Sequence, residues 1–352
     1  MKNIIYLLII TCLVFTQSCQ DIVEDFEIEE KDPKIVLNTK FYADSIPQIH
    51  LSKSSSINDH PNTIIPLKEA TVEVSDENGN KTSFSYDKNG FYINNNFIVA
   101  ENTTYIITAS NEGMETISAE IYVPSKPELV FKDTNIIITS NNCLYCMEEK
   151  KLKFTFEIND DKETTDYYII QASANIIQYE YDYGEYYDSI NQQYYSIYEI
   201  VDSSIYYQLL DFETYSPSLK MVYDYANIWL VTPDWIPSGK IFYYSDELIK
   251  GSNTTVVFNQ YFWHSFHTIK DRKITFNLIK ISEDYFKYMQ TRARENEIDE
   301  NPFVEDVTPF NNIKNGLGHA MGACVYKIDL DLSAYNDDFI YQREQEQGIY
   351  KW

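Results

Sequence analysis

The sequence predicts a mainly β protein, in which an N-terminal immunoglobulin-like β-sandwich is followed by a larger β-rich domain with one amphipathic helix. Short segments of alternating apolar and polar residues recur with turn residues between them, as in half-buried strands. Helical spacing of apolar residues is clear in a segment near the C-terminus. Hydrophobic residues make up 44% of the chain and aromatic residues 15%, which is ample for a buried core.

Residues 34–127 are predicted to form the immunoglobulin-like sandwich. Residues 71–74 alternate between apolar and polar side chains and lead into a turn at residues 77–80, which is the pattern of a β-hairpin. A second hairpin turns at residues 111–113. Strands about 8–12 residues apart, with turn residues between them, are typical of such sandwiches. The segment "VPSKPEL", around residues 124–127, is expected to link this domain to the next.

Residues 128–345 are predicted to form the larger β-rich domain, and residues 346–352 a C-terminal tail. Strand-like segments such as "KKLKFTFEIND" and "RKITFNLIKI" recur through this region. The expected helix lies near residues 282–295, where Ser282 is a suitable N-cap and acidic residues follow in the first turn. Its aromatic and apolar stripe is predicted to face the core and consists of Tyr285, Phe286 and Met289.

The segment "NNIKNGLGHAMG" carries three glycines, Gly316, Gly318 and Gly322. It lacks the preceding strand and following helix of a dinucleotide-binding fingerprint. Glycine permits a positive φ angle and a close approach of another backbone. We therefore expect a tight backbone path at this segment, and the alternative is that it lines a partner surface.

Residues 1–18 are predicted to be a lipoprotein signal peptide. Lys2 precedes an apolar run over residues 4–15, which is too short to span a bilayer but suits a secretory signal. The small residue Ser18 stands directly before Cys19, which we expect to be lipidated, although Thr16 occupies the position where such signals usually have Leu. The lipid chains would then anchor the protein to the outer membrane. The alternative is an ordinary secretory signal.

Residues 19–33 are predicted to be an acidic tether. The segment "QDIVEDFEIEEKD" has seven carboxylates among thirteen residues, as in a solvated spacer. It is also interpreted as an export signal that directs the lipoprotein to the cell exterior. The whole chain has 54 acidic and 28 basic side chains and a formal charge of −26, so it repels nucleic acid. Nucleic-acid binding is therefore excluded.

If Cys19 is lipidated, three cysteines remain in an oxidising compartment, and three explanations are open for the Cys-x-x-Cys pair among them. We expect Cys143 and Cys146 to form a local disulfide that pins a loop. A redox or metal role is a second interpretation, and free thiols are a third. A structural zinc site needs a second pair of ligands, which Cys324 alone does not supply.

The sequence predicts no catalytic, cofactor-binding or metal-binding residues. His264 and His267 are three residues apart, but in a strand such positions lie on opposite faces, so packed or surface histidines are favoured over a metal site. Neither a phosphate-binding loop nor a nucleophile or zinc-protease motif is present. We therefore expect that the protein is not an enzyme and uses no cofactor.

The segment between Tyr179 and Tyr207 contains ten tyrosines. We expect a strand that turns between Gly184 and Gln193 and returns through "YYSIYEI". One interpretation is a hairpin whose aromatic face covers the core. However, four tyrosines occur as adjacent pairs that must point to both faces, which predicts a ligand or partner face formed by Tyr186, Tyr187, Tyr194 and Tyr195.

The chain resembles the domain of unknown function 4249, a family of outer-membrane lipoproteins of Bacteroidetes. The resemblance covers most of the mature chain and depends on "KEATVEVSDENGNKTSFSYDKNGFY", "TTYIITA", "YYSDELIKG", "ISEDYFKYM" and, most distinctly, "PFNNIKNGLGHAMG". Members commonly have Phe near the second glycine of the last motif, where this chain has His319. The resemblance implies accessory lipoproteins encoded beside TonB-dependent transporters, without an enzymatic activity.

Our leading hypothesis is a non-catalytic lipoprotein that faces the cell exterior and helps a TonB-dependent transporter capture a nutrient. The ligand classes it allows are a small nutrient, a peptide or a glycan. An adhesin or structural envelope lipoprotein without a transporter is the alternative. A surface hydrolase is a third hypothesis, which the lack of nucleophile and metal motifs disfavours.

Overall fold

The computed structural model describes residues 32–55, 64–139, 149–159, 164–188, 193–210, 213–214, 220–223, 240–246, 254–261, 271, 273–300, 308–333 and 350–351. Within these residues the protein consists mainly of β-strands with one helix, α2 (Glu283–Glu300), which confirms the predicted fold class. The predicted signal peptide and nearly all of the predicted acidic tether lie outside the described residues. In the described part of the chain, no helix combines the length and apolarity that crossing a membrane requires.

The described residues of the N-terminal part form eight strands, and alternating burial in several of them agrees with the sequence pattern. They are β1 (Ile35–Tyr42), β2 (Ile49–Lys53), β3 (Ile65–Pro66), β4 (Thr71–Asp76), β5 (Lys81–Tyr86), β6 (Phe91–Ile93), β7 (Thr103–Ser110) and β8 (Ile117–Val123). In β1, buried and half-buried residues alternate along the whole strand, as expected for a strand with one face on a core.

These strands form two layers around one core, which fits the predicted immunoglobulin-like sandwich. Strand β5 belongs to both layers, because Phe84 pairs with β4 and Ser85 pairs with β6. The core between the layers includes Phe41, Phe84 and Tyr105, and the Phe41 and Tyr105 rings lie 5.5 Å apart. Such aromatic contacts stabilise a core by about 1 kcal/mol beyond the area that they bury.

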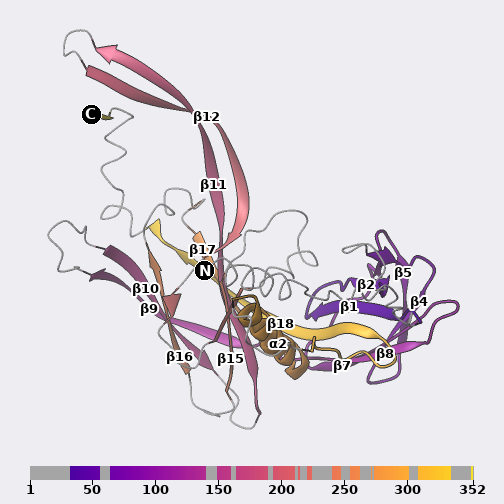
Figure 1. Cartoon of the computed structure of the whole chain (residues 1–352). Coiled ribbons are helices and arrows are strands. Elements are labelled where there is room, and N and C mark those ends of the chain that lie inside the picture. The colour runs from indigo at the N-terminus through magenta and orange to yellow at the C-terminus, as the bar shows by residue number, and fades with distance from the viewer. Residues whose placement is uncertain are drawn as a thin grey trace, which may run out of the picture.

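A strand from the C-terminal end of the chain completes this N-terminal part. Strand β18 (Leu317–Asp331) pairs in parallel with β1, from Val36 opposite Leu317 to Tyr42 opposite Ala323. Ile313 and Ala320 belong to the same core as the sandwich residues. Figure 1 shows β18 running beside β1 and on into the second part of the protein.

The glycines of the "NNIKNGLGHAMG" segment explain how β18 approaches its neighbours so closely. Gly318 has a φ of +108°, and a Cβ at this position would clash with the backbone oxygen of Leu37. A Cβ on Gly322 would clash with the backbone oxygen of Tyr122. The expected tight backbone path is therefore confirmed: these positions need glycine for close packing.

The described residues of the second part form ten strands besides β18. They are β9 (Glu128–Thr139), β10 (Glu149–Asn159), β11 (Tyr167–Asp188), β12 (Gln193–Leu209), β13 (Glu213–Thr214), β14 (Lys220–Tyr223), β15 (Lys240–Ser245), β16 (Thr254–Tyr261), β17 (Lys273–Ile281) and β19 (Tyr350–Lys351). Strands β13, β16, β10 and β9 form a four-stranded sheet, and the others join β18 in a fifteen-stranded sheet that continues into the N-terminal part.

Aromatic side chains join these two sheets. The Phe276 ring of β17 lies 5.1 Å from the Phe154 ring and 4.6 Å from the Phe156 ring, both on β10. Phe154 and Phe156 are fully buried, as are Leu152 and Ile158 on the same face of β10. The alternating pattern that predicted this strand therefore places its apolar face on the core.

Helix α2 begins where the sequence predicts. The backbone N–H of Tyr285 donates to Ser282 Oγ at 3.3 Å, so Ser282 is the N-cap. The same oxygen accepts a hydrogen bond from the backbone N–H of Gly322 at 3.3 Å. Tyr285, Tyr288 and Met289 then pack on Met321 and Ala323 of β18. One N-cap hydroxyl therefore also fixes the helix to the shared strand.

We predict that Gly322→Ala lowers the free energy of unfolding by about 3 kcal/mol, because a methyl group would overlap a backbone oxygen that cannot move independently. Gly113→Ala is the matched control: its φ is +74° but the position is open, so about 1 kcal/mol is expected from backbone strain alone. Guanidinium denaturation measures both losses of stability, with each substitution made in a truncated protein that begins at Gln20. Equal losses for the two variants would show that β18 is not tightly held at Tyr122.

Candidate functional site

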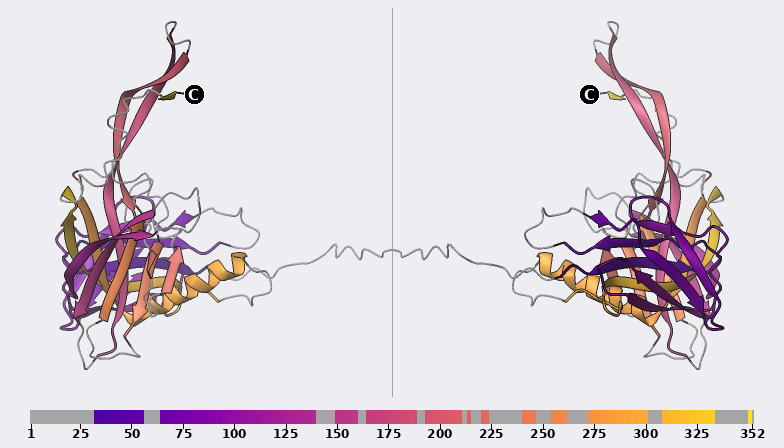
Figure 2. Two further views of the ribbon diagram at one scale, coloured as in Figure 1. Left: turned by 90° about the vertical axis from the view of Figure 1, so that its left-hand side faces the viewer. Right: turned by 90° about the vertical axis from the view of Figure 1, so that its right-hand side faces the viewer.

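Strand β11 is buried at its start and leaves the core part-way along its length. Tyr168, Ile170, Ala172 and Ala174 belong to the core, whereas Asn175 is exposed. Beyond this point β11 pairs with β12 as far as Asp188 opposite Gln193. We call residues 175–188 with residues 193–207 the arm. Figures 1 and 2 show it as a twisted two-stranded ribbon that extends well away from the buried start of β11. The short strand β19 lies beside it, with Lys351 opposite Tyr195.

The hairpin that the tyrosine pattern predicts is confirmed. The chain reverses between Asp188 and Gln193, within the predicted interval, and returns as an antiparallel strand. Tyr186 lies opposite Tyr195, and Tyr187 lies opposite Tyr194. The tyrosine pairs that are adjacent in sequence are thus also opposite one another across the ribbon, and each cross-strand pair belongs to one face.

The two large exposed apolar side chains that the structure describes on the arm belong to one of its faces. Tyr187 is 47% exposed and Ile205 is 54% exposed. Ile205 lies opposite Ile177, and alternate positions of β11 from Ile177 lead to Tyr187, so both exposed residues belong to the same face. Of the four tyrosines proposed as a partner face, the structure describes the side chain of Tyr187. That these four residues form a partner face stays a prediction.

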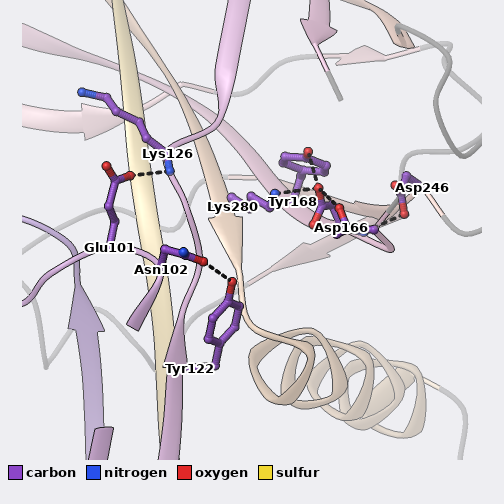
Figure 3. A network of polar contacts seen from close by, with 9 residues as sticks. Glu101, Asn102, Tyr122, Lys126, Asp166, Tyr168, Asp246 and Lys280 are labelled. Atoms are coloured by element: carbon purple, nitrogen blue, oxygen red, sulfur yellow. Dashed lines mark hydrogen bonds and ion pairs between the residues drawn. The ribbon is translucent and has the colours of Figure 1, made fainter. Parts of the chain in front are cut away.

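A polar network fixes the buried start of β11, as Figure 3 shows. Lys280 Nζ of β17 lies 2.6 Å from Asp166 Oδ2, and both side chains are largely buried. The backbone N–H of Asp166 donates to Asp246 Oδ1 at 2.7 Å, and the backbone N–H of Asp246 donates to the Asp166 carbonyl at 3.1 Å. Removing one partner of such a buried ion pair typically costs about 3–5 kcal/mol. The network therefore holds the strand from which the arm extends.

A second set of contacts, also in Figure 3, holds the connection between the two parts. The backbone N–H of Lys126 donates to Glu101 Oε2 at 2.6 Å, and the Tyr122 hydroxyl donates to Asn102 Oδ1 at 3.1 Å. The residues expected to form a linker are thus tied to the loop before β7. This connection is short and hydrogen-bonded.

The remaining candidate residues fall into described and undescribed groups. Cys19, Cys143 and Cys146, together with His60, His264 and His267, lie outside the described residues. Cys324 is a free, buried thiol, and burial raises its pKa to about 11, which favours the protonated form. Within the described ranges, no group of three or more His, Cys, Asp or Glu residues is placed to hold a metal ion.

His319 is a residue of β18 whose ring packs on helix α2, and it is held in its neutral form. Its ring is 4.7 Å from the Tyr288 ring. Burial, and then the positive charges of Lys40 and Arg292, lower the pKa of His319 to about 4. This position of β18 therefore carries an imidazole in a site that disfavours its charged form.

A family model described as Domain of unknown function (DUF4249) matches residues 23–328. No curated protein matches the chain. Among solved structures, the B domain of a biofilm associated protein is similar over 83% of this chain and 85% of that one, with 8% identity and a TM-score of 0.13. At this TM-score the likeness carries no argument.

We predict that His319→Phe makes the stability of the protein less sensitive to acid. The pKa of His319 is about 4 in the folded protein against an ordinary 6.5, so the unfolded chain binds a proton that the folded one does not. Stability from this group is complete above pH 6.5 and is lost as the pH falls toward 4. We compare the free energy of unfolding of the variant with that of wild type at each pH. Between pH 8 and pH 5 this difference should shift by about 1–2 kcal/mol in favour of the variant.

Guanidinium denaturation at pH 8 and pH 5 measures this effect, and the carboxylates common to both chains cancel in the comparison. The same difference in stability at both pH values would show that His319 is protonated normally in the folded protein.

Proposed function

We propose that this chain, which belongs to the DUF4249 family, is a non-catalytic lipoprotein of the outer membrane that acts by contact with a TonB-dependent transporter. Cys19 carries the lipid anchor, and the protein faces the cell exterior. Its role is to help the transporter capture or admit a nutrient of one of three classes: a small molecule, a peptide or a glycan.

The single observation that supports a contact function best is the arm. A two-stranded ribbon makes no core of its own and is marginally stable in water. Its projection therefore adds little to the stability of the fold, and a contact surface is the use that fits it. Tyrosine suits such a surface, because its ring is apolar, its hydroxyl forms hydrogen bonds and its rotamer entropy is small.

The anchorage of the arm also supports this function. The start of β11 lies in the fifteen-stranded sheet and is fixed by the buried Asp166–Lys280 ion pair. A binding surface on a firmly held strand loses less conformational freedom on association than one on an isolated loop. The buried charges of Asp166 and Lys280 therefore fix the strand that carries the arm. This structural role explains them without a catalytic one.

The sequence of the tether supports attachment to a membrane by lipid. Lipid chains contribute about 0.8 kcal/mol for each buried methylene, and two or more chains give stable anchoring. An acidic segment after Cys19 keeps the folded part away from anionic lipid heads. β1 begins at Ile35, directly after the tether, so the anchor and the folded part are close in sequence.

We predict that the wild-type lipoprotein co-purifies with a TonB-dependent transporter from detergent-solubilised outer membrane. Serine substitution of Tyr186, Tyr187, Tyr194 and Tyr195 should lower recovery of the transporter at least about tenfold, because buried aromatic anchors dominate the binding energy of most interfaces. Quantitative mass spectrometry of the purified material measures the recovery.

The matched control replaces four exposed apolar residues of the rest of the protein with serine: Ile64, Ile98, Ile106 and Phe131. This variant should keep its transporter. A wild-type protein that purifies without any transporter would contradict the proposed function, and it would favour the adhesin or structural alternative.

A further inference from the structure

We propose that a small aliphatic carboxylate binds on the sheet face of β1 and β18, beside helix α2, with Lys40 and His319 at its charged end. Neither the arm nor a transporter takes part, so this inference goes beyond the proposed function and does not rest on it. The register of the two strands brings the groups together. Asn38 of β1 lies opposite His319, and Lys40 lies opposite Met321.

This sheet face is the one that α2 covers in part. Met321 and Ala323 pack on the helix, which Figure 1 shows beside β18. His319 is the alternate residue before Met321, and alternate residues of a strand share a face. Lys40 and His319 are both half-buried, so a small ligand reaches them from the surface.

Two tyrosines of α2 connect the two basic side chains. Lys40 Nζ lies 5.1 Å from the centre of the Tyr285 ring, and the His319 ring lies 4.7 Å from the Tyr288 ring. The two tyrosine rings are 6.3 Å apart. Lys40 and His319 therefore belong to one small cluster with aromatic walls.

The charges around His319 favour an anion. Besides burial, which is the larger cause, the positive charges of Lys40 and Arg292 lower the pKa of His319. Among the described residues, Lys40 forms no ion pair with a carboxylate. Asp284, in the first turn of α2, accepts a hydrogen bond from Asn312 Nδ2 at 2.8 Å. Positive charge therefore gathers here in a chain whose formal charge is −26.

A ring nitrogen of His319 points independently to a ligand. Its Nε2 atom is buried, and no group in the described part of the chain forms a hydrogen bond with it. Buried polar atoms of proteins are nearly always paired, so an orphaned one needs an explanation. A carboxylate has two oxygens that accept hydrogen bonds, one from an imidazole with its proton on Nε2 and one from the Lys40 ammonium.

An apolar pair continues the same face next to His319. Leu317 lies opposite Val36 and is 40% exposed. Val36 and Asn38 are alternate residues of β1, so Leu317 and His319, which lie opposite them, are about 7 Å apart on one face. A ligand whose carboxylate contacts His319 can therefore pack its tail on Leu317 and Val36. This order of groups favours an aliphatic carboxylate over a bare inorganic anion.

Calorimetric titration with hexanoate tests the site on the full-length lipoprotein in micelles of an uncharged detergent, with empty micelles as the blank. Wild type should bind hexanoate, and Lys40→Met should bind it at least about tenfold more weakly, because a charge-assisted hydrogen bond is lost. Lys40→Arg keeps the positive charge and should recover most of the affinity. Lys88→Met, at an exposed lysine of the N-terminal part, is the matched control and should bind as wild type does.

The pH dependence shows whether the carboxylate contacts His319. A bound carboxylate favours the charged imidazole and so raises the pKa of His319 from about 4. If the pKa returns to its ordinary 6.5, hexanoate should bind about fourfold more tightly at pH 6 than at pH 8. His319→Phe should bind hexanoate more weakly and should abolish this difference between the two pH values.

The tail is tested separately. Leu317→Ser should lower the affinity for hexanoate about fivefold, because part of the apolar surface that the tail covers is lost. Hexylammonium, which has the same tail and the opposite charge, should not bind to wild type.

Two results would overturn the inference. One is equal affinity of wild type and both the Lys40→Met and His319→Phe variants for hexanoate. The other is binding of hexylammonium as tight as that of hexanoate, which would show adsorption through the tail alone. Recovery of a transporter with the lipoprotein changes neither outcome, so the inference and the proposed function can fail separately.

Discussion

The hydrogen bonding of β18 on both of its edges is the constraint on which the rest of the structure depends. Its first half pairs with β1 and its second half with β17, and β17 in turn pairs with β11. A continuous path of paired strands therefore joins β1 to the strand that forms the arm. Because the backbone groups of such a sheet are hydrogen-bonded to one another, the start of the arm is fixed relative to β1 by the fold.

This arrangement demands particular residues where β18 passes between its neighbours. Gly318 and Gly322 allow backbone contacts that a side chain would prevent, and the Ser282 hydroxyl joins the cap of α2 to Gly322. The helix packs against the same strand through Met289 and Met321. The segment that most distinctly carries the family resemblance is therefore the segment that holds the two parts together, which explains its glycine content without a ligand.

The sequence predicted features that depend on neighbouring residues. Alternation predicted strands such as β1 and β10, Ser282 predicted the start of α2, and the tyrosine pattern predicted the hairpin that becomes the arm. Pairings between distant segments left no local signal in the sequence. Examples are the pairing of β18 with β1 and the ion pair of Asp166 with Lys280, two residues that are 114 positions apart. The β-bulge at Val201 was equally hidden: Glu180 lies opposite Asp202 but Tyr181 lies opposite Ile200. Register depends on the pairing of two strands and not on either strand alone.

The central claim is that the arm is the surface by which the protein contacts a transporter. It is tested most directly by placing a photo-crosslinking benzoylphenylalanine at Tyr187 or at Tyr122, which are 47% and 45% exposed, and irradiating intact cells. The account predicts a covalent adduct with a TonB-dependent transporter from position 187 and none from position 122. No adduct from position 187, or equal adducts from both positions, would contradict it.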